Sequence, residues 1–190
     1  FVKYFKKNTD IYKGMYLIDN ELGGTTPLDI ILKFKSDNNT FDTSIDVDEE
    51  NDLEIEDDFF SDDIFEEEDN NIWFTNEKIE TVKSVHQYLE NRKEIGKVAS
   101  IYSLIDIANQ INKNNLSMFE LSVLYNEIPI DYKSDIIDPY LNIDNDIIKI
   151  SARVKDSNNI KRNVLINEIN SYLSNEFSNL EEYKVNGLLV

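Results

Sequence analysis

A run of acidic residues, uninterrupted by any positive charge, divides this chain. No lysine or arginine occurs between Ser36 and Glu77, and residues 37–70 hold 17 of the 38 acidic side chains. The rest of the chain is close to neutral, with 21 acidic and 19 basic residues. Packing many like charges together is opposed by a repulsion that physiological salt only partly screens. We therefore expect residues 37–71 to form an acidic, mobile insert.

The first 35 residues predict a strand, a helix and a second strand. Apolar residues alternate over 2–6 and again over 28–35, which is typical of half-buried strands. Between them a helical period places four apolar side chains on one face, after an N-cap at Asn8 or Thr9. These side chains are Ile11, Met15, Ile18 and Leu22. Gly23 and Gly24 then end the helix.

The end of the chain repeats this plan. An alternating stretch over 148–155 predicts a strand, a helical period follows over 159–176, and a last strand begins at Tyr183. Two β-α-β units at the chain ends predict an α+β protein of the ferredoxin-like split type, interrupted by a long helical and acidic insertion. The expected domains are a discontinuous α/β core of residues 1–36 plus 146–190, the acidic insert 37–71, and an inserted α/β segment 72–145.

The inserted segment 72–145 has three helical patterns and one short strand, near 98–101. The first helix, over 75–90, is capped by Thr75. The second begins at Ser103 and should turn four side chains inward, namely Leu104, Ile107, Ala108 and Ile111. The third follows a capping box formed by Ser117 and Glu120.

No group of residues predicts a catalytic, cofactor or metal site. His86, the sole histidine, falls on the apolar stripe of its helix, and with no cysteine a zinc site lacks ligands. A series of acids, Asp46, Asp48, Glu50, Asp52 and Asp57, partly imitates a calcium loop, but Asn51 stands where an EF-hand needs glycine. Gly23-Gly24 lacks the Lys-Ser/Thr of a phosphate loop. We expect no enzymatic activity and, without a basic patch, no nucleic-acid partner.

Several segments together resemble an extracytoplasmic loop of predicted exporters of the RND superfamily, the relatives of hydrophobe/amphiphile efflux pumps, MMPL lipid transporters and Patched-like proteins. The opening run Tyr16–Asp29 (YLIDNELGGTTPLD) is closer to the second large loop of these transporters than to the first. The other similar segments follow in the same order: Trp73-Phe74-Thr75 with Val82 and Tyr88-Leu89, LSVLYNEIP from Leu121, Asp138-Pro139-Tyr140-Leu141, Ile150–Ser157 and Asn186–Val190.

The resemblance implies a porter domain on the periplasmic side of the inner membrane. One transmembrane helix of the same transporter would then precede Phe1, and another would follow Val190. It would bind a hydrophobic or amphiphilic substrate, and it would form an oligomer or bind a periplasmic partner protein. Proton flow through charged residues in the membrane helices would supply the energy for transport. The alternative is a stand-alone acidic binding domain or a calcium-associating one.

Overall fold

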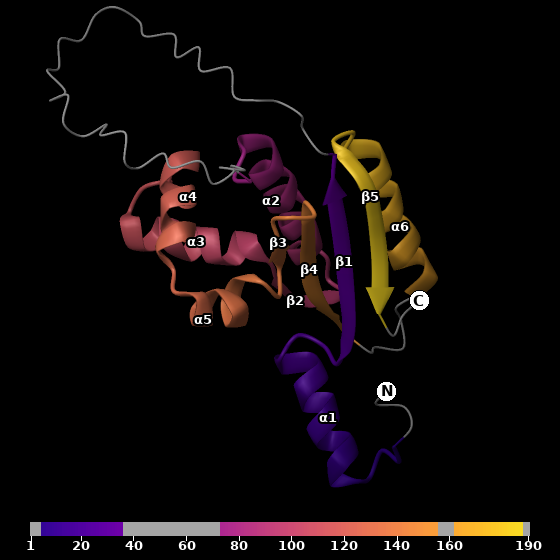
Figure 1. Cartoon of the computed structure of the whole chain (residues 1–190). Coiled ribbons are helices and arrows are strands. Elements are labelled where there is room, and N and C mark those ends of the chain that lie inside the picture. The colour runs from indigo at the N-terminus through magenta and orange to yellow at the C-terminus, as the bar shows by residue number, and fades with distance from the viewer. Residues whose placement is uncertain (1–4, 36–72, 156–161, 188–190) are drawn as a thin grey trace, which may run out of the picture. The chain divides into compact units, whose positions relative to one another are not determined.

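The described strands are β1 Thr26–Phe34, β2 Ile95–Ala99, β3 Leu141–Asn142, β4 Ile147–Val154 and β5 Leu180–Gly187. They belong to a computed structural model of the chain, which describes residues 5–35, 73–155 and 162–187. The strands form one sheet in the order β2-β4-β1-β5, with β3 beside β4, and all neighbours run antiparallel (Figure 1). Helices and an antiparallel sheet place the chain in the α+β class, as the sequence predicts.

One face of the sheet is buried because apolar residues alternate along its central strands. Every second side chain of β1 from Thr26 to Phe34 is buried. The alternate residues of β4, from Ile148 to Val154, join them in one hydrophobic core. Since successive side chains of a strand point to opposite faces, this period fixes which face is turned to the core.

Two long helices cover the buried face, α2 (Asn76–Glu90) and α6 (Arg162–Glu176). Both contribute to the same core as the sheet, through Val82, Val85, Leu89, Leu165, Ile169 and Leu173. The helices also meet each other, because the rings of Tyr88 and Tyr172 stack with centroids 3.8 Å apart. An ion pair ties α2 to the start of β4, with Lys78 Nζ 2.6 Å from Asp146 Oδ1.

The sheet includes residues that were predicted to belong to the inserted segment. The elements following β1 in the described chain are α2 and β2, so part of 72–145 lies in the sheet itself. The predicted boundary of the insertion differs from the structure because local periodicity does not show which strands pair. β1 and β5 pair directly, so strands from residues 1–36 and 146–190 share one sheet. Phe5 and Lys6 are not in a strand, and the rest of the expected strand 2–6 lies outside the described residues.

The N-terminal helix α1 spans Asp10–Glu21. The side chain of Thr9 caps it by accepting a hydrogen bond from the backbone N–H of Tyr12. The helix ends at Glu21 with Leu22 as its C-cap, and Gly23 follows with a φ of 88°, a left-handed conformation that glycine adopts readily. The predicted helix stop at Gly23-Gly24 is confirmed.

A group of helices follows β2, on the opposite side of Figure 1 from β5 and α6. It comprises α3 Ile101–Asn112, α4 Met118–Glu127, α5 Ile130–Tyr132 and a π-helical turn at Lys133–Ile137. The predicted capping box of Ser117 and Glu120 is present at α4. The predicted inward face of α3 is partly wrong, because Ile107 and Ile111 are exposed and Ile101 and Ile105 are buried instead.

The chain divides into two units, residues 36–72 and the remainder. The acidic insert expected at 37–71, with its calcium-like series, falls in the first unit, which lies outside the described residues. Among the helices that the structure does describe, none has the length and hydropathy needed to cross a bilayer.

Candidate apolar binding site

An apolar pocket lies within the group of helices α3, α4 and α5. Its volume is about 150 Å³. Twelve residues line it: Phe74, Ile101, Leu104, Ile105, Ala108, Leu121, Leu124, Tyr125, Ile128, Tyr132, Ile136 and Ile137. Apart from two tyrosine hydroxyls, the lining side chains carry no polar group. The pocket therefore offers dispersion contact and burial to an apolar guest.

The floor and the rim of the pocket differ in exposure. Ile105, Leu121 and Ile137 are buried and form part of the hydrophobic core. Leu124, Tyr132 and Ile136 are exposed, so the pocket is open to solvent on their side. An exposed cluster of large apolar side chains around a cavity is typical of a surface that meets an apolar ligand or partner.

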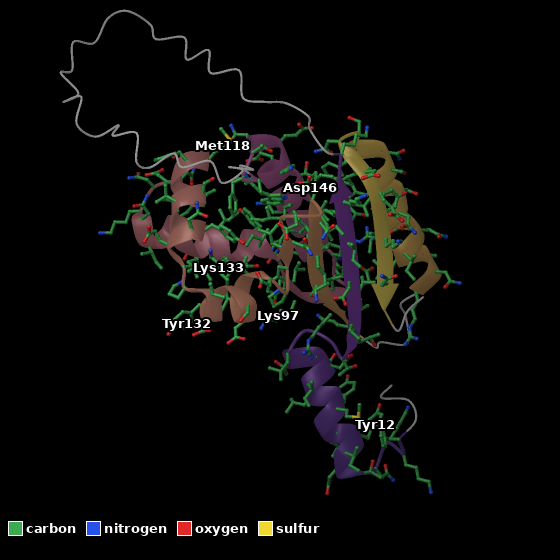
Figure 2. The ribbon with its side chains drawn as sticks, viewed as in Figure 1. Tyr12, Lys97, Met118, Tyr132, Lys133 and Asp146 are labelled. Carbon is green, nitrogen blue, oxygen red and sulfur yellow. The ribbon has the colours of Figure 1, made fainter. Side chains whose placement is uncertain are left out.

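The π-helical turn places a cation at the pocket. Lys133 Nζ lies 4.4 Å from the centre of the Tyr125 ring, a cation–π contact (Figure 2 labels Lys133 and its neighbour Tyr132). Burial raises the pKa of the Tyr125 phenol above its ordinary value, and the negative charges of Asp138 and Asp144 raise it further. The turn itself is closed by the backbone N–H of Asp138, which donates to the carbonyl of Lys133.

The segment that forms the rim is acidic. Residues 124–137, which include the exposed lining residues, contain three carboxylates and a single basic residue, Lys133. Glu127, Asp131 and Asp135 are exposed, and each precedes a lining residue in the sequence. The site therefore favours a guest whose polar end is neutral or positively charged over one that is an anion.

The contacts of His86 leave no signal in the sequence. The structure places its Nδ1 2.8 Å from the Oγ of Ser100 and its Nε2 3.3 Å from a carboxylate oxygen of Glu90. These three residue types occur together in hydrolases, but the Ser100 hydroxyl also caps α3, and Ser100 is only 1% exposed. The arrangement ties α2 to the start of α3. His86 is thus buried on the core side of its helix, as predicted.

Carboxylates do not gather into a metal site in the part of the chain that the structure describes. The glycines Gly23 and Gly24 pack against backbone: a Cβ on Gly24 would lie 2.6 Å from the carbonyl of Val154. A more polar hollow, lined by Asp29, Lys97, Tyr140, Ser151 and Arg153 among others, lies over the opposite face of the sheet. Asp29 already accepts a hydrogen bond from the Ser151 hydroxyl in that hollow.

Comparisons with protein-family models, with curated proteins and with solved structures gave no significant match.

Proposed function

We propose that the chain is an extracytoplasmic porter domain of a proton-driven exporter of the RND superfamily. In this proposal the apolar pocket between α3, α4 and the π-helical turn is part of the path of a hydrophobic or amphiphilic substrate. The ordered sequence similarities, from Tyr16–Asp29 to the closing Asn186–Val190, support the family. The pocket is the observation that carries the function, because it is a solvent-open cavity lined almost wholly by apolar side chains.

The sheet order supports a ferredoxin-like split fold within this proposal. β1 and β2 are each antiparallel to β4, which lies between them, so β1 and β2 run parallel. In the same way β4 and β5 are parallel and are separated by β1. Each pair has a helix between its strands in the chain order, α2 or α6. Two such split β-α-β units that interlock in one sheet are the arrangement expected of a ferredoxin-like domain.

The chemistry of the pocket supports transport rather than turnover as its role. Its lining offers no carboxylate, histidine or serine hydroxyl to act as nucleophile or base. Its size is about that at which an apolar protein cavity takes up a benzene-sized guest. A larger amphiphile would place one apolar end in the pocket and leave its polar end at the acidic rim. The substrate class proposed is therefore neutral or cationic amphiphiles.

Binding of fluorescent probes with a common alkyl tail tests this proposal. The matched variants are Leu124→Asp and Val123→Asp, because both side chains are on α4 and 42% exposed, yet only Leu124 lines the pocket. We expect Leu124→Asp to weaken binding of a cationic probe by at least about tenfold, and Val123→Asp to change it by less than about twofold. Circular dichroism would show that both variants are folded.

The opposite outcomes would count against the proposal. Equal loss in both variants, or no saturable binding by the unmodified chain, would remove the pocket as the site. Tighter binding of an anionic probe than of a cationic one with the same tail would refute the proposed substrate class. A marked calcium-induced change in stability, without probe binding, would favour the alternative of a calcium-associating domain.

A further inference from the structure

The apolar face of α1 is left uncovered by the described part of the chain. Ile11, Ile18 and Leu22 recur at helical spacing and are all exposed, and Met15 between them is half-buried. A face of this kind normally packs on a core. Here the residue of α1 that is buried is Asp19, not an apolar one.

The helix is attached to the sheet at its C-terminal end. The carboxylate of Asp19 accepts hydrogen bonds from the backbone N–H and the hydroxyl of Thr25, both at 2.9 Å. Beyond it, Gly23 and Gly24 lie so close to Gly96 and Val154 that neither has room for a side chain. Figure 1 shows α1 beyond the start of β1. The helix therefore stands at the sheet end where β2 begins and where β4 and β5 finish.

This end of the sheet carries positive charge, although the chain has a net charge of −19. Residues 1–18 contain four lysines and one aspartate, and Lys6, Lys7 and Lys13 are exposed. Lys97 on β2 and Arg153 on β4 are exposed at the same end. Figure 2 shows Lys97 and Tyr12 toward this end and Asp146 toward the other. The acids nearby are Asp10, which pairs with Lys13, the buried Asp19, Glu21, Glu94, and Asp29, which lines a hollow with Lys97 and Arg153. Lys93 and Lys155, beside β2 and β4, add to the basic side chains at this end.

Aromatic side chains accompany the lysines. The rings of Tyr12 and Tyr16 stack, with centroids 6.1 Å apart, and Tyr16 and Phe5 are exposed. Exposed aromatic rings, lysines and an apolar helix face in one segment are the combination found in helices that lie in the interface of a bilayer. A second copy of the chain fits this surface less well, because its lysines would face each other.

We propose that α1 and the basic end of the sheet dock on the surface of an anionic lipid bilayer. The stripe of Ile11, Met15, Ile18 and Leu22 enters the headgroup region, and Lys6 and Lys7, which precede the helix, contact lipid phosphates. This inference goes beyond the proposed function, because it assigns a partner to a surface separate from the apolar pocket. It holds or fails without reference to what the pocket binds.

Sedimentation with lipid vesicles tests the docking surface. The probe is a vesicle of mixed phosphatidylglycerol and phosphatidylcholine, with pure phosphatidylcholine for comparison. The matched variants are Leu22→Ser and Leu17→Ser, because the two side chains are similarly exposed, at 65% and 61%. Leu22 belongs to the apolar stripe, whereas Leu17 lies on another side of the helix. A third variant carries Lys6→Glu and Lys7→Glu.

We expect binding to mixed vesicles that is at least about tenfold stronger than to pure phosphatidylcholine. Leu22→Ser should lower it about fivefold and Leu17→Ser less than about twofold. The double lysine variant should lower it at least about tenfold, and added salt should act in the same direction. All variants should keep the binding of the alkyl probe to the pocket, which separates this test from that of the proposed function.

Three results would overturn the docking surface. The first is equal binding to both kinds of vesicle. The second is equal loss with Leu22→Ser and Leu17→Ser. The third is a concentration-dependent dimer that Leu22→Ser dissolves while vesicle binding stays unchanged, because that would make a second copy the occupant of the stripe.

Discussion

The glycine pair after α1 sets the close approach of two backbones. Gly24 has a φ of 112°, and a Cβ there would lie 2.6 Å from the carbonyl carbon and oxygen of Val154. We predict that Gly24→Ala lowers the free energy of unfolding by at least about 2 kcal/mol, since both the φ and the contact are unfavourable to a side chain. Gly14 in α1 has open space around it. Gly14→Ala should therefore be neutral or stabilising by up to about 1 kcal/mol in the same urea titration. Similar effects of the two variants would contradict this account.

Tyr125 gives the pocket a spectroscopic reporter. Burial raises its pKa above the ordinary value of 10.0, with further contributions from Asp138 and Asp144. Because folding favours the neutral phenol, the related stability is present below pH 10.0 and is lost as the pH rises through the pKa of the folded protein. The phenol can be followed by its absorbance as the pH is raised. We predict that the difference between the titration curves of the unmodified chain and of Tyr125→Phe has its midpoint above pH 10.0. Above pH 10.0, the free energy of unfolding should fall less steeply with pH in Tyr125→Phe than in the unmodified chain. A midpoint at or below that value would show that the phenol is not shielded as described.

At the level of elements, the pocket is an unfilled space between helices rather than a preformed polar site. Ala108 on α3 lines it with the smallest of the twelve side chains. We predict that Ala108→Leu fills part of the cavity, weakens alkyl-probe binding by at least about tenfold and leaves the free energy of unfolding unchanged or higher. Probe titration and urea unfolding of the same sample measure both effects. Weaker binding together with strong destabilisation would instead indicate that the space is already occupied by protein.

The periodicity of single elements was predictable, and their partners were not. Alternation at 28–35 and 148–155 predicted β1 and β4 to within two residues, because burial on one face imposes a period of two. The same signal cannot tell that β1 pairs with both β4 and β5, since pairing joins residues far apart in the chain. β3, two residues long, has no period to detect.

The candidate site was only partly visible in the sequence for the same reason. Leu104 and Ala108 were predicted to face inward and do line the pocket, whereas Ile107 and Ile111 share their apolar character but are exposed. An apolar stripe shows which residues share a helix face, but not what covers that face. The contact of His86 with Ser100 depends on the packing of α2 against α3 and left no local signal.

At the level of the whole molecule, we predict that the acidic insert is dispensable for the folding of the rest of the chain. Replacing residues 38–56 by a short Gly-Ser linker should leave the melting temperature unchanged or slightly higher, because like-charge repulsion is relieved. A control variant keeps the full length of the chain and has the acids of residues 38–56 changed to Asn and Gln. It separates the effect of charge from that of chain length. Unfolding of the linker variant, or a sharp gain in stability of the unmodified chain in millimolar calcium, would make the insert a structural element.

Transport by the full-length exporter to which the proposal assigns this chain tests the proposed function most directly. The protein would be reconstituted in proteoliposomes, and the movement of a cationic amphiphilic dye would be followed with and without a proton gradient. We predict dye transport that depends on the proton gradient. Leu124→Asp should slow it by at least about tenfold, which corresponds to about 1.4 kcal/mol, and Val123→Asp should leave its rate unchanged. Absence of gradient-dependent transport, or equal slowing by the two variants at equal protein levels, would contradict the assignment of this chain as a porter domain.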